Sequence, residues 1–232
     1  MKLLARWLLR KPFTNRPTTY RRSTKLNFLS LEARDVPATL NGLYSTGVAA
    51  DGQPLAAGSI DTHYEITAAP AGAATGAPSA TMPGFPFPYW SGNSSASAWL
   101  SPRADENGPA SDPAGEYTYE TAFNMAGLDP ATASVTGRVF ADNHVTQVLL
   151  NGVPVEGFSP NSGGSDFAGG VPLSIKSGFT GGVNSLSFVV LNDAGTEYNP
   201  SGFRADLSGT AQVATSVSLS AGARPPPGSR LR

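Results

Sequence analysis

Short runs of alternating apolar and polar residues dominate the chain from residue 117 onward. Residues 117–125 and 133–140 both follow a period of two, which is typical of a β-strand with one buried and one exposed face. Glycine (26) and proline (20) together make up about a fifth of the 232 residues and punctuate these runs. That composition disfavours a helical bundle. We find no convincing helical stretch of ten residues, so the pattern predicts an all-β chain.

The number and spacing of the runs favour two packed sheets. We predict about eight short strands joined by turns rich in Gly, Pro, Asn and Asp, as in an antiparallel β-sandwich or jelly roll. The strands predicted besides the two above are 63–67, 98–100, 145–150, 153–155, 173–175, 185–191 and 203–207.

The dipeptide Asn151-Gly152 is the clearest local signal. It lies between two apolar runs, and both residue types tolerate the positive φ that a type I′ hairpin turn requires. Pro154 follows in the return strand and has no N–H to donate to a neighbouring strand. We therefore predict a tight hairpin whose second strand lies at a sheet edge.

Charge divides the chain into segments. Residues 1–38 contain nine basic and two acidic residues, whereas residues 39–220 contain four basic and fifteen acidic ones. The opposite net charges of these two segments suggest that a basic leader precedes a separate, acidic domain. A basic nucleic-acid-binding arm would look similar, but this one lacks interleaved Gly and aromatic residues, and we expect no nucleic-acid partner. We predict a largely unstructured export leader over 1–39, a β-sandwich domain over 40–211 and a disordered tail over 212–232.

Composition also narrows the chemistry. The chain has no Cys, which excludes a disulfide scaffold, a zinc-thiolate site and a thiol nucleophile. The sequence has no Gly-x-Ser-x-Gly elbow and no Gly-rich phosphate loop. We expect His63 to be a packed or surface residue in a strand and His144 a solvated residue in a turn. Carboxylate pairs for glycoside hydrolysis cannot be selected from so many acidic residues. We expect no enzyme, with a hydrolase as the weakest alternative.

An aromatic, proline-rich segment is the best candidate for binding. Residues 85–90 read Phe-Pro-Phe-Pro-Tyr-Trp, and prolines that hold such a loop extended reduce the entropy lost on binding. Flat aromatic faces with nearby amides can stack on a sugar and bind its hydroxyls; alternatively, these rings cap the core. We expect Trp90 to be partly buried with one ring edge exposed, and Trp99 to lie in the core. The predicted ligand-binding residues are Tyr89, Trp90, Asn93, Asn143 and Arg204.

Acidic and amide side chains in predicted turns are candidate metal ligands. Carboxylate and amide oxygens are the ligands that Ca²⁺ takes in proteins. No Asp-x-Asp-x-Asp-Gly loop is present, and ordinary turn residues are the alternative explanation. We predict Asp142, Asn192 and Asp193 as ligands of a structural calcium ion, with Asn143 and Glu197 nearby.

Residues 21–39 resemble an export signal. Arg21 and Arg22 precede the segment 31–39, which reads Leu-Glu-Ala-Arg-Asp-Val-Pro-Ala-Thr. This is similar to the N-terminal sorting motif of planctomycete surface and secreted proteins, a basic stretch followed by Leu-Glu-x-Arg-x-x-Pro-Ala. The resemblance implies an exported protein, extracellular or at the cell surface. The apolar runs before Arg10 are too short and too charged to span a membrane, so we expect no transmembrane segment.

The order of short motifs over about 41–211 carries a second resemblance. It is similar to the β-sandwich ectodomains of bacterial exported proteins, which are related in layout to galactose-binding-like jelly rolls. The motifs include Asp61 to Tyr64, Ala98-Trp99-Leu100, Gly115 to Tyr119 and Gly202-Phe203-Arg204. The resemblance implies a carbohydrate-binding or adhesive module with a glycan or cell-surface polysaccharide as partner and a structural calcium ion. A purely structural surface or matrix domain is the main alternative. The sequence does not indicate the oligomeric state.

Overall fold

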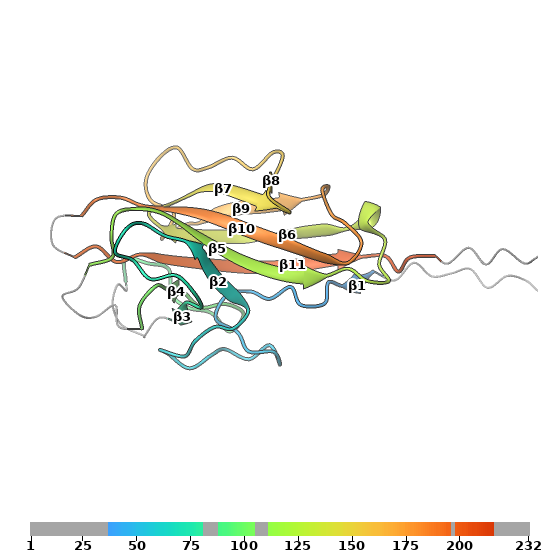
Figure 1. Ribbon diagram of the computed structural model, residues 1–232, viewed down its shortest axis with the longest axis horizontal. Coiled ribbons are helices and arrows are strands. Elements are labelled where there is room, and N and C mark those ends of the chain that lie inside the picture. The colour runs from blue at the N-terminus through green and yellow to red at the C-terminus, as the bar shows by residue number, and fades with distance from the viewer. Residues whose placement is uncertain (1–36, 81–87, 105–110, 196–197, 216–232) are drawn as a thin grey trace, which may run out of the picture. The chain divides into compact units, whose positions relative to one another are not determined.

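A computed structural model describes residues 37–80, 88–104, 111–195 and 198–215 (Figure 1). The predicted leader up to residue 36 and the predicted tail from residue 216 lie outside these residues. So do Phe85, Phe87 and Glu197.

Two antiparallel sheets pack face to face, which confirms the predicted all-β antiparallel sandwich. Sheet A has the order β3-β4-β11-β6-β9, with β1 also paired to β11, and sheet B has the order β2-β5-β10-β7-β8. The strands of sheet A are β1 (Ala38–Thr39), β3 (Ser79–Ala80), β4 (Leu100–Ser101), β6 (Ser134–Asp142), β9 (Val171–Ile175) and β11 (Gly202–Ala211). The strands of sheet B are β2 (Tyr64–Ala68), β5 (Gly115–Asn124), β7 (His144–Leu150), β8 (Val153–Pro154) and β10 (Val183–Asn192).

Each predicted strand corresponds to one of these elements. The sequence pattern missed β1 and β3, which have two residues each and are too short to show a period. His144 is the first residue of β7 rather than part of a turn, so its expected place was wrong. One 3₁₀ turn, Pro130–Thr132, precedes β6 and is capped by the Asp129 side chain.

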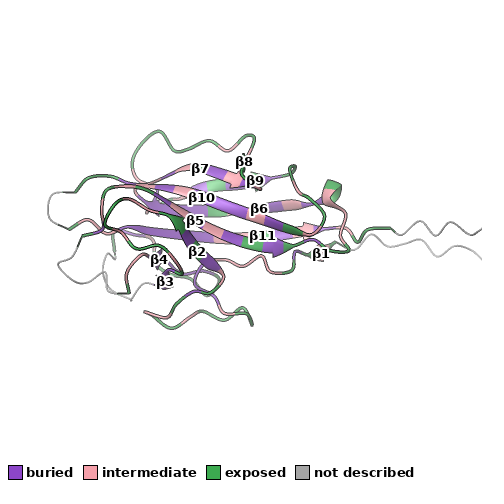
Figure 2. Ribbon diagram, viewed as in Figure 1, coloured by how far each residue is buried: buried purple, intermediate pink, exposed green. Residues whose placement is uncertain are grey.

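The core lies between the sheets, and the alternation of β5 shows why. Its apolar positions, including Tyr117, Tyr119 and Phe123, are buried, whereas Glu116 and Glu120 lie on the outer face. In Figure 2 the buried residues gather in the strands of the two sheets. Phe203 of β11 crosses the interface and packs against Tyr119 at a centroid distance of 5.0 Å. Burial of these large rings is the main favourable term in the folding of such a sandwich.

The hairpin between β7 and β8 has the predicted turn. Asn151 and Gly152 adopt φ values of 54° and 76°, the positive values that a type I′ turn requires. Leu150 pairs with Val153 across the two-residue loop. Pro154 lies in β8, which is the outermost strand of sheet B. Both expectations are confirmed.

The ladder of sheet A extends beyond the predicted domain limits of 40 and 211. Ala38 and Thr39 pair with the end of β11. Val213 forms a further bridge with Leu128. Pro37 and Ala38, the last residues of the motif that resembles a sorting signal, therefore stand at the first strand of the sandwich.

Candidate functional site

A second aromatic cluster lies on the outer face of sheet A. Val139 and Ala141 belong to the main core, so Phe140 between them faces away from it. Trp90 and Trp99 pack there, with ring centroids 4.3 Å apart, and Trp99 meets Phe140 edge to face at 6.2 Å. The segment that carries both tryptophans is therefore fixed on this face by buried rings.

A glycine makes room for Trp90. A Cβ at Gly202 would collide with the six-membered ring of Trp90 and lie close to Trp99. The indole consequently sits on bare backbone and is only 3% exposed. The expected exposed ring edge of Trp90 is not found, because the loop folds flat onto the start of β11. Trp99 is fully buried, as expected, but in this outer cluster.

Asp142 anchors the Trp90 indole. It is the last residue of β6, in register with Gly202, and its Oδ2 accepts a hydrogen bond of 3.1 Å from Trp90 Nε1. Burial raises the pKa of the Asp142 carboxyl to about 6. The bond from Trp90 lowers this pKa and the charge of Asp193 raises it further, both to a smaller extent than burial.

Arg204 of β11 forms hydrogen bonds with the segment that connects Trp90 to Trp99. Its guanidinium lies 4.6 Å from the centre of the Phe140 ring, a cation–π arrangement. Nε donates to Ser97 Oγ at 2.8 Å, and Nη1 donates to the carbonyl of Gly92 and to Ser91 Oγ. Burial lowers the Arg204 pKa, and Asp206 opposes this. None of these bonds uses Nη2, and Arg204 as a whole is only 6% exposed.

The remaining predicted ligand-binding residues differ in availability. Tyr89, which directly precedes the buried Trp90, is 72% exposed. Asn93 uses Oδ1 to accept from the backbone N–H of Trp99 at 2.9 Å. Asn143 accepts from the backbone N–H of Asp193 at 2.7 Å and donates to Ser165. Tyr89 and Asn93, which are both exposed, are thus the groups that a ligand could contact here.

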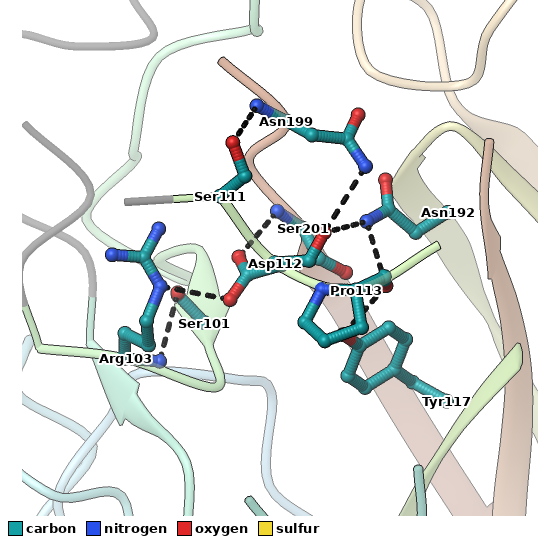
Figure 3. A network of polar contacts seen from close by, with 9 residues as sticks. All are labelled: Ser101, Arg103, Ser111, Asp112, Pro113, Tyr117, Asn192, Asn199 and Ser201. Carbon is teal, nitrogen blue, oxygen red and sulfur yellow. Dashed lines mark hydrogen bonds and ion pairs between the residues drawn. The ribbon is translucent and has the colours of Figure 1, made fainter. Parts of the chain in front are cut away.

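Asn192, a predicted metal ligand, belongs to a separate polar network (Figure 3). Its Nδ2 donates to the carbonyls of Asp112 and Pro113. The Asp112 carboxylate in turn accepts from Arg103 Nε and from the Ser201 backbone N–H, each at 2.8 Å. This network fastens the segment before β5 to the start of β11, which gives Asn192 a structural role.

The three predicted calcium ligands therefore have different surroundings. Asp142 binds the indole, Asn192 binds backbone carbonyls, and the Asp193 side chain is about half exposed, 3.9 Å from His144 Nε2. Within the described ranges no group of three His, Cys, Asp or Glu residues is arranged to hold a metal. The calcium ion stays a prediction.

Besides Asp112, two more buried carboxylates were missed by the sequence analysis. Asp61 accepts from the backbone N–H groups of Gly47 and His63 at 2.7 and 2.8 Å, and burial raises its pKa. Asp166 accepts from the backbone N–H of Val145 at 2.8 Å and fixes the preceding glycine-rich loop to β7. Neither residue lies in a periodic run, so no local pattern marks it as buried.

No helix in the part of the chain that the structure describes is long and apolar enough to cross a membrane. Comparison with models of protein families, with curated proteins and with solved structures found no match to the chain.

Proposed function

We propose that this protein is an exported, non-catalytic carbohydrate-binding module that acts at the cell surface. The observation that carries the proposal is the contrast between two neighbouring residues: Tyr89 is 72% exposed, whereas Trp90 is 3% exposed. A tyrosine ring that is open to water can stack on the apolar face of a sugar, and here it sits beside a fixed point of the fold.

The anchoring of Trp90 supports a preformed site. Trp90 is held by Asp142, by Trp99 and by the bare backbone at Gly202. Tyr89 consequently starts from a backbone that is already ordered, so a sugar that stacks on its ring does not have to order the segment. The exposed Asn93, four residues further along, carries a side-chain amide that can form hydrogen bonds with sugar hydroxyls.

Export is supported by sequence alone. The basic stretch and the Leu-Glu-x-Arg-x-x-Pro-Ala pattern end at Ala38, where the first strand begins. A sorting segment that ends where the sandwich starts can be recognised, or removed, without disturbing the strand pairing of sheet A.

A glycan array tests the proposal with the full chain and two variants. Wild type should bind a subset of glycans, and Tyr89→Ala should lose that binding while its melting temperature stays unchanged. Tyr198→Ala is the matched control, because Tyr198 is another strongly exposed tyrosine. An array with no binding by wild type would instead favour the purely structural surface domain, and equal loss in both variants would remove Tyr89 from the site.

A further inference from the structure

The segment that connects Trp90 to Trp99 carries an acceptor sequence for N-linked glycosylation. Residues 93–95 read Asn-Ser-Ser, which matches the pattern Asn-x-Ser/Thr, where x is any residue except proline. No other asparagine in the chain satisfies the pattern; Asn199 is followed two residues later by Ser201, but the residue between them is proline. The chain therefore has a single acceptor position, at residue 93.

The Asn93 side chain is fixed through its oxygen and leaves its nitrogen unused. Oδ1 accepts a hydrogen bond of 2.9 Å from the backbone N–H of Trp99, a fully buried residue. Nδ2 forms no hydrogen bond with the described residues, and Asn93 is exposed. An N-linked glycan is attached at Nδ2 and keeps the amide oxygen. A sugar can therefore be attached here without breaking the bond to Trp99.

The two serines of the acceptor sequence have different roles. Ser94 closes a tight turn, because its Oγ accepts from the backbone N–H groups of the second and third residues after it, at 3.1 Å each. Ser95, the residue that the pattern requires, is exposed, and its hydroxyl forms no hydrogen bond with the described residues. On the other side, Arg204 donates to the carbonyl of Gly92. The acceptor sequence thus lies on a surface loop whose backbone is held on both sides.

Asn199 has the opposite arrangement. Its Nδ2 donates to the carbonyls of Asp112 and Asp193 at 3.1 and 2.9 Å. Attachment of a sugar removes one N–H from the nitrogen, so one of these two bonds would be lost. Asn199 is thus excluded both by the proline that follows it and by its contacts, which makes it a matched control within the same chain.

We infer that Asn93 is the attachment site of an N-linked glycan. Nδ2 attacks the anomeric carbon of a sugar that is activated as a phosphate or pyrophosphate ester. The new C–N bond replaces the C–O bond to the phosphate, which leaves with the electron pair of that bond, and the amide nitrogen gives up one proton. The inference rests on the export in the proposed function, since such acceptor sequences are used in secreted chains. One N–H remains on Nδ2, so the amide keeps a donor for the sugar contacts proposed above.

Mass spectrometry of the full chain, purified from the surface and from the interior of the cells that make it, tests the inference. We expect the surface form of wild type to carry sugar mass on the peptide that contains Asn93. Asn93→Gln and Ser95→Ala should lose this mass completely, whereas Ser95→Thr should keep it, because threonine also satisfies the pattern. Ser95→Ala retains the Asn93 side chain and its bond to Trp99, so it should fold like wild type. Asn199→Gln should carry the same sugar mass as wild type.

Two outcomes would overturn the attachment site and leave the export standing. These are a surface form of wild type without sugar mass at Asn93, and sugar mass that persists in Ser95→Ala. A chain found only inside the cell and without sugar would refute both the export and the attachment site, whereas a retained chain with sugar at Asn93 would refute the export alone. Tyr89→Ala separates the attachment site from the binding site, because it should lose binding on the glycan array and keep the sugar mass.

Discussion

Asp142 should make the stability of this protein depend on pH in an unusual direction. Its pKa is about 6 in the folded chain against an ordinary value of 3.8, so the folded state holds the proton more tightly than the unfolded state. Stability from this group is therefore fully present below about pH 4 and is lost as the pH rises through 6. One pKa unit corresponds to about 1.4 kcal/mol, which makes the loss about 3 kcal/mol at pH 7.

The variant Asp142→Asn isolates this effect. Asparagine keeps an oxygen that accepts from Trp90 Nε1 but carries no charge. Any cost of placing the amide nitrogen in this buried position is independent of pH, so the informative quantity is the difference between the proteins as a function of pH. Asp61, whose pKa is also raised, contributes equally to both proteins and cancels.

The assay is urea unfolding of wild type and Asp142→Asn at pH 4, 5, 6 and 7. We expect the free energy of unfolding of the variant, relative to wild type, to increase by about 2.4 kcal/mol between pH 4 and pH 7, because the unfolded carboxyl is already partly ionised at pH 4. A difference that does not change with pH would refute the reasoning, because it would mean that the carboxyl titrates alike in the folded and unfolded chains.

Three further predictions concern stability and export. Gly152→Val should cost about 1–2 kcal/mol, because a β-branched residue resists the φ of 76° at this turn position; an unchanged urea midpoint would contradict it. Trp90→Ala should cost roughly 3–5 kcal/mol, since it empties a buried site between Trp99 and Gly202; a loss below about 0.5 kcal/mol would place the ring at the surface. Deletion of residues 1–36 should leave a folded domain, since β1 begins at Ala38, but retain it inside the cell; equal surface yield of the truncated and full-length forms would disprove the role of the leader.

The sequence predicts a strand well where one face of the strand is buried and the other is exposed to solvent. In β5 and in the Asn151-Gly152 hairpin, neighbouring residues alone determine the conformation, through alternation in the first case and positive φ in the second. Such local rules act within a few residues of the chain. They are therefore visible without knowledge of the fold.

The position of Trp90 could not be predicted in this way. Its burial depends on the missing side chain of Gly202, which is far away in the chain and adjacent only after β11 has paired with β6. One signal was present in the sequence. Val139, Phe140 and Ala141 are all apolar, so this part of β6 departs from alternation and indicates a layer on both faces. The buried carboxylates Asp61 and Asp166 had no comparable signal.

The pairing of β1 with the end of β11 has a mechanical consequence. Ala38 is in register with Ala211, at the opposite end of a ten-residue strand from Gly202 and the Tyr89 segment, a span of about 30 Å (Figure 1). A force that separates Ala38 from Ala211 breaks the hydrogen bonds between β1 and β11 one after another. A pull between Tyr89 and the segment that follows Ala211 instead acts along β11, so the nine register pairs with β6 are loaded together in shear.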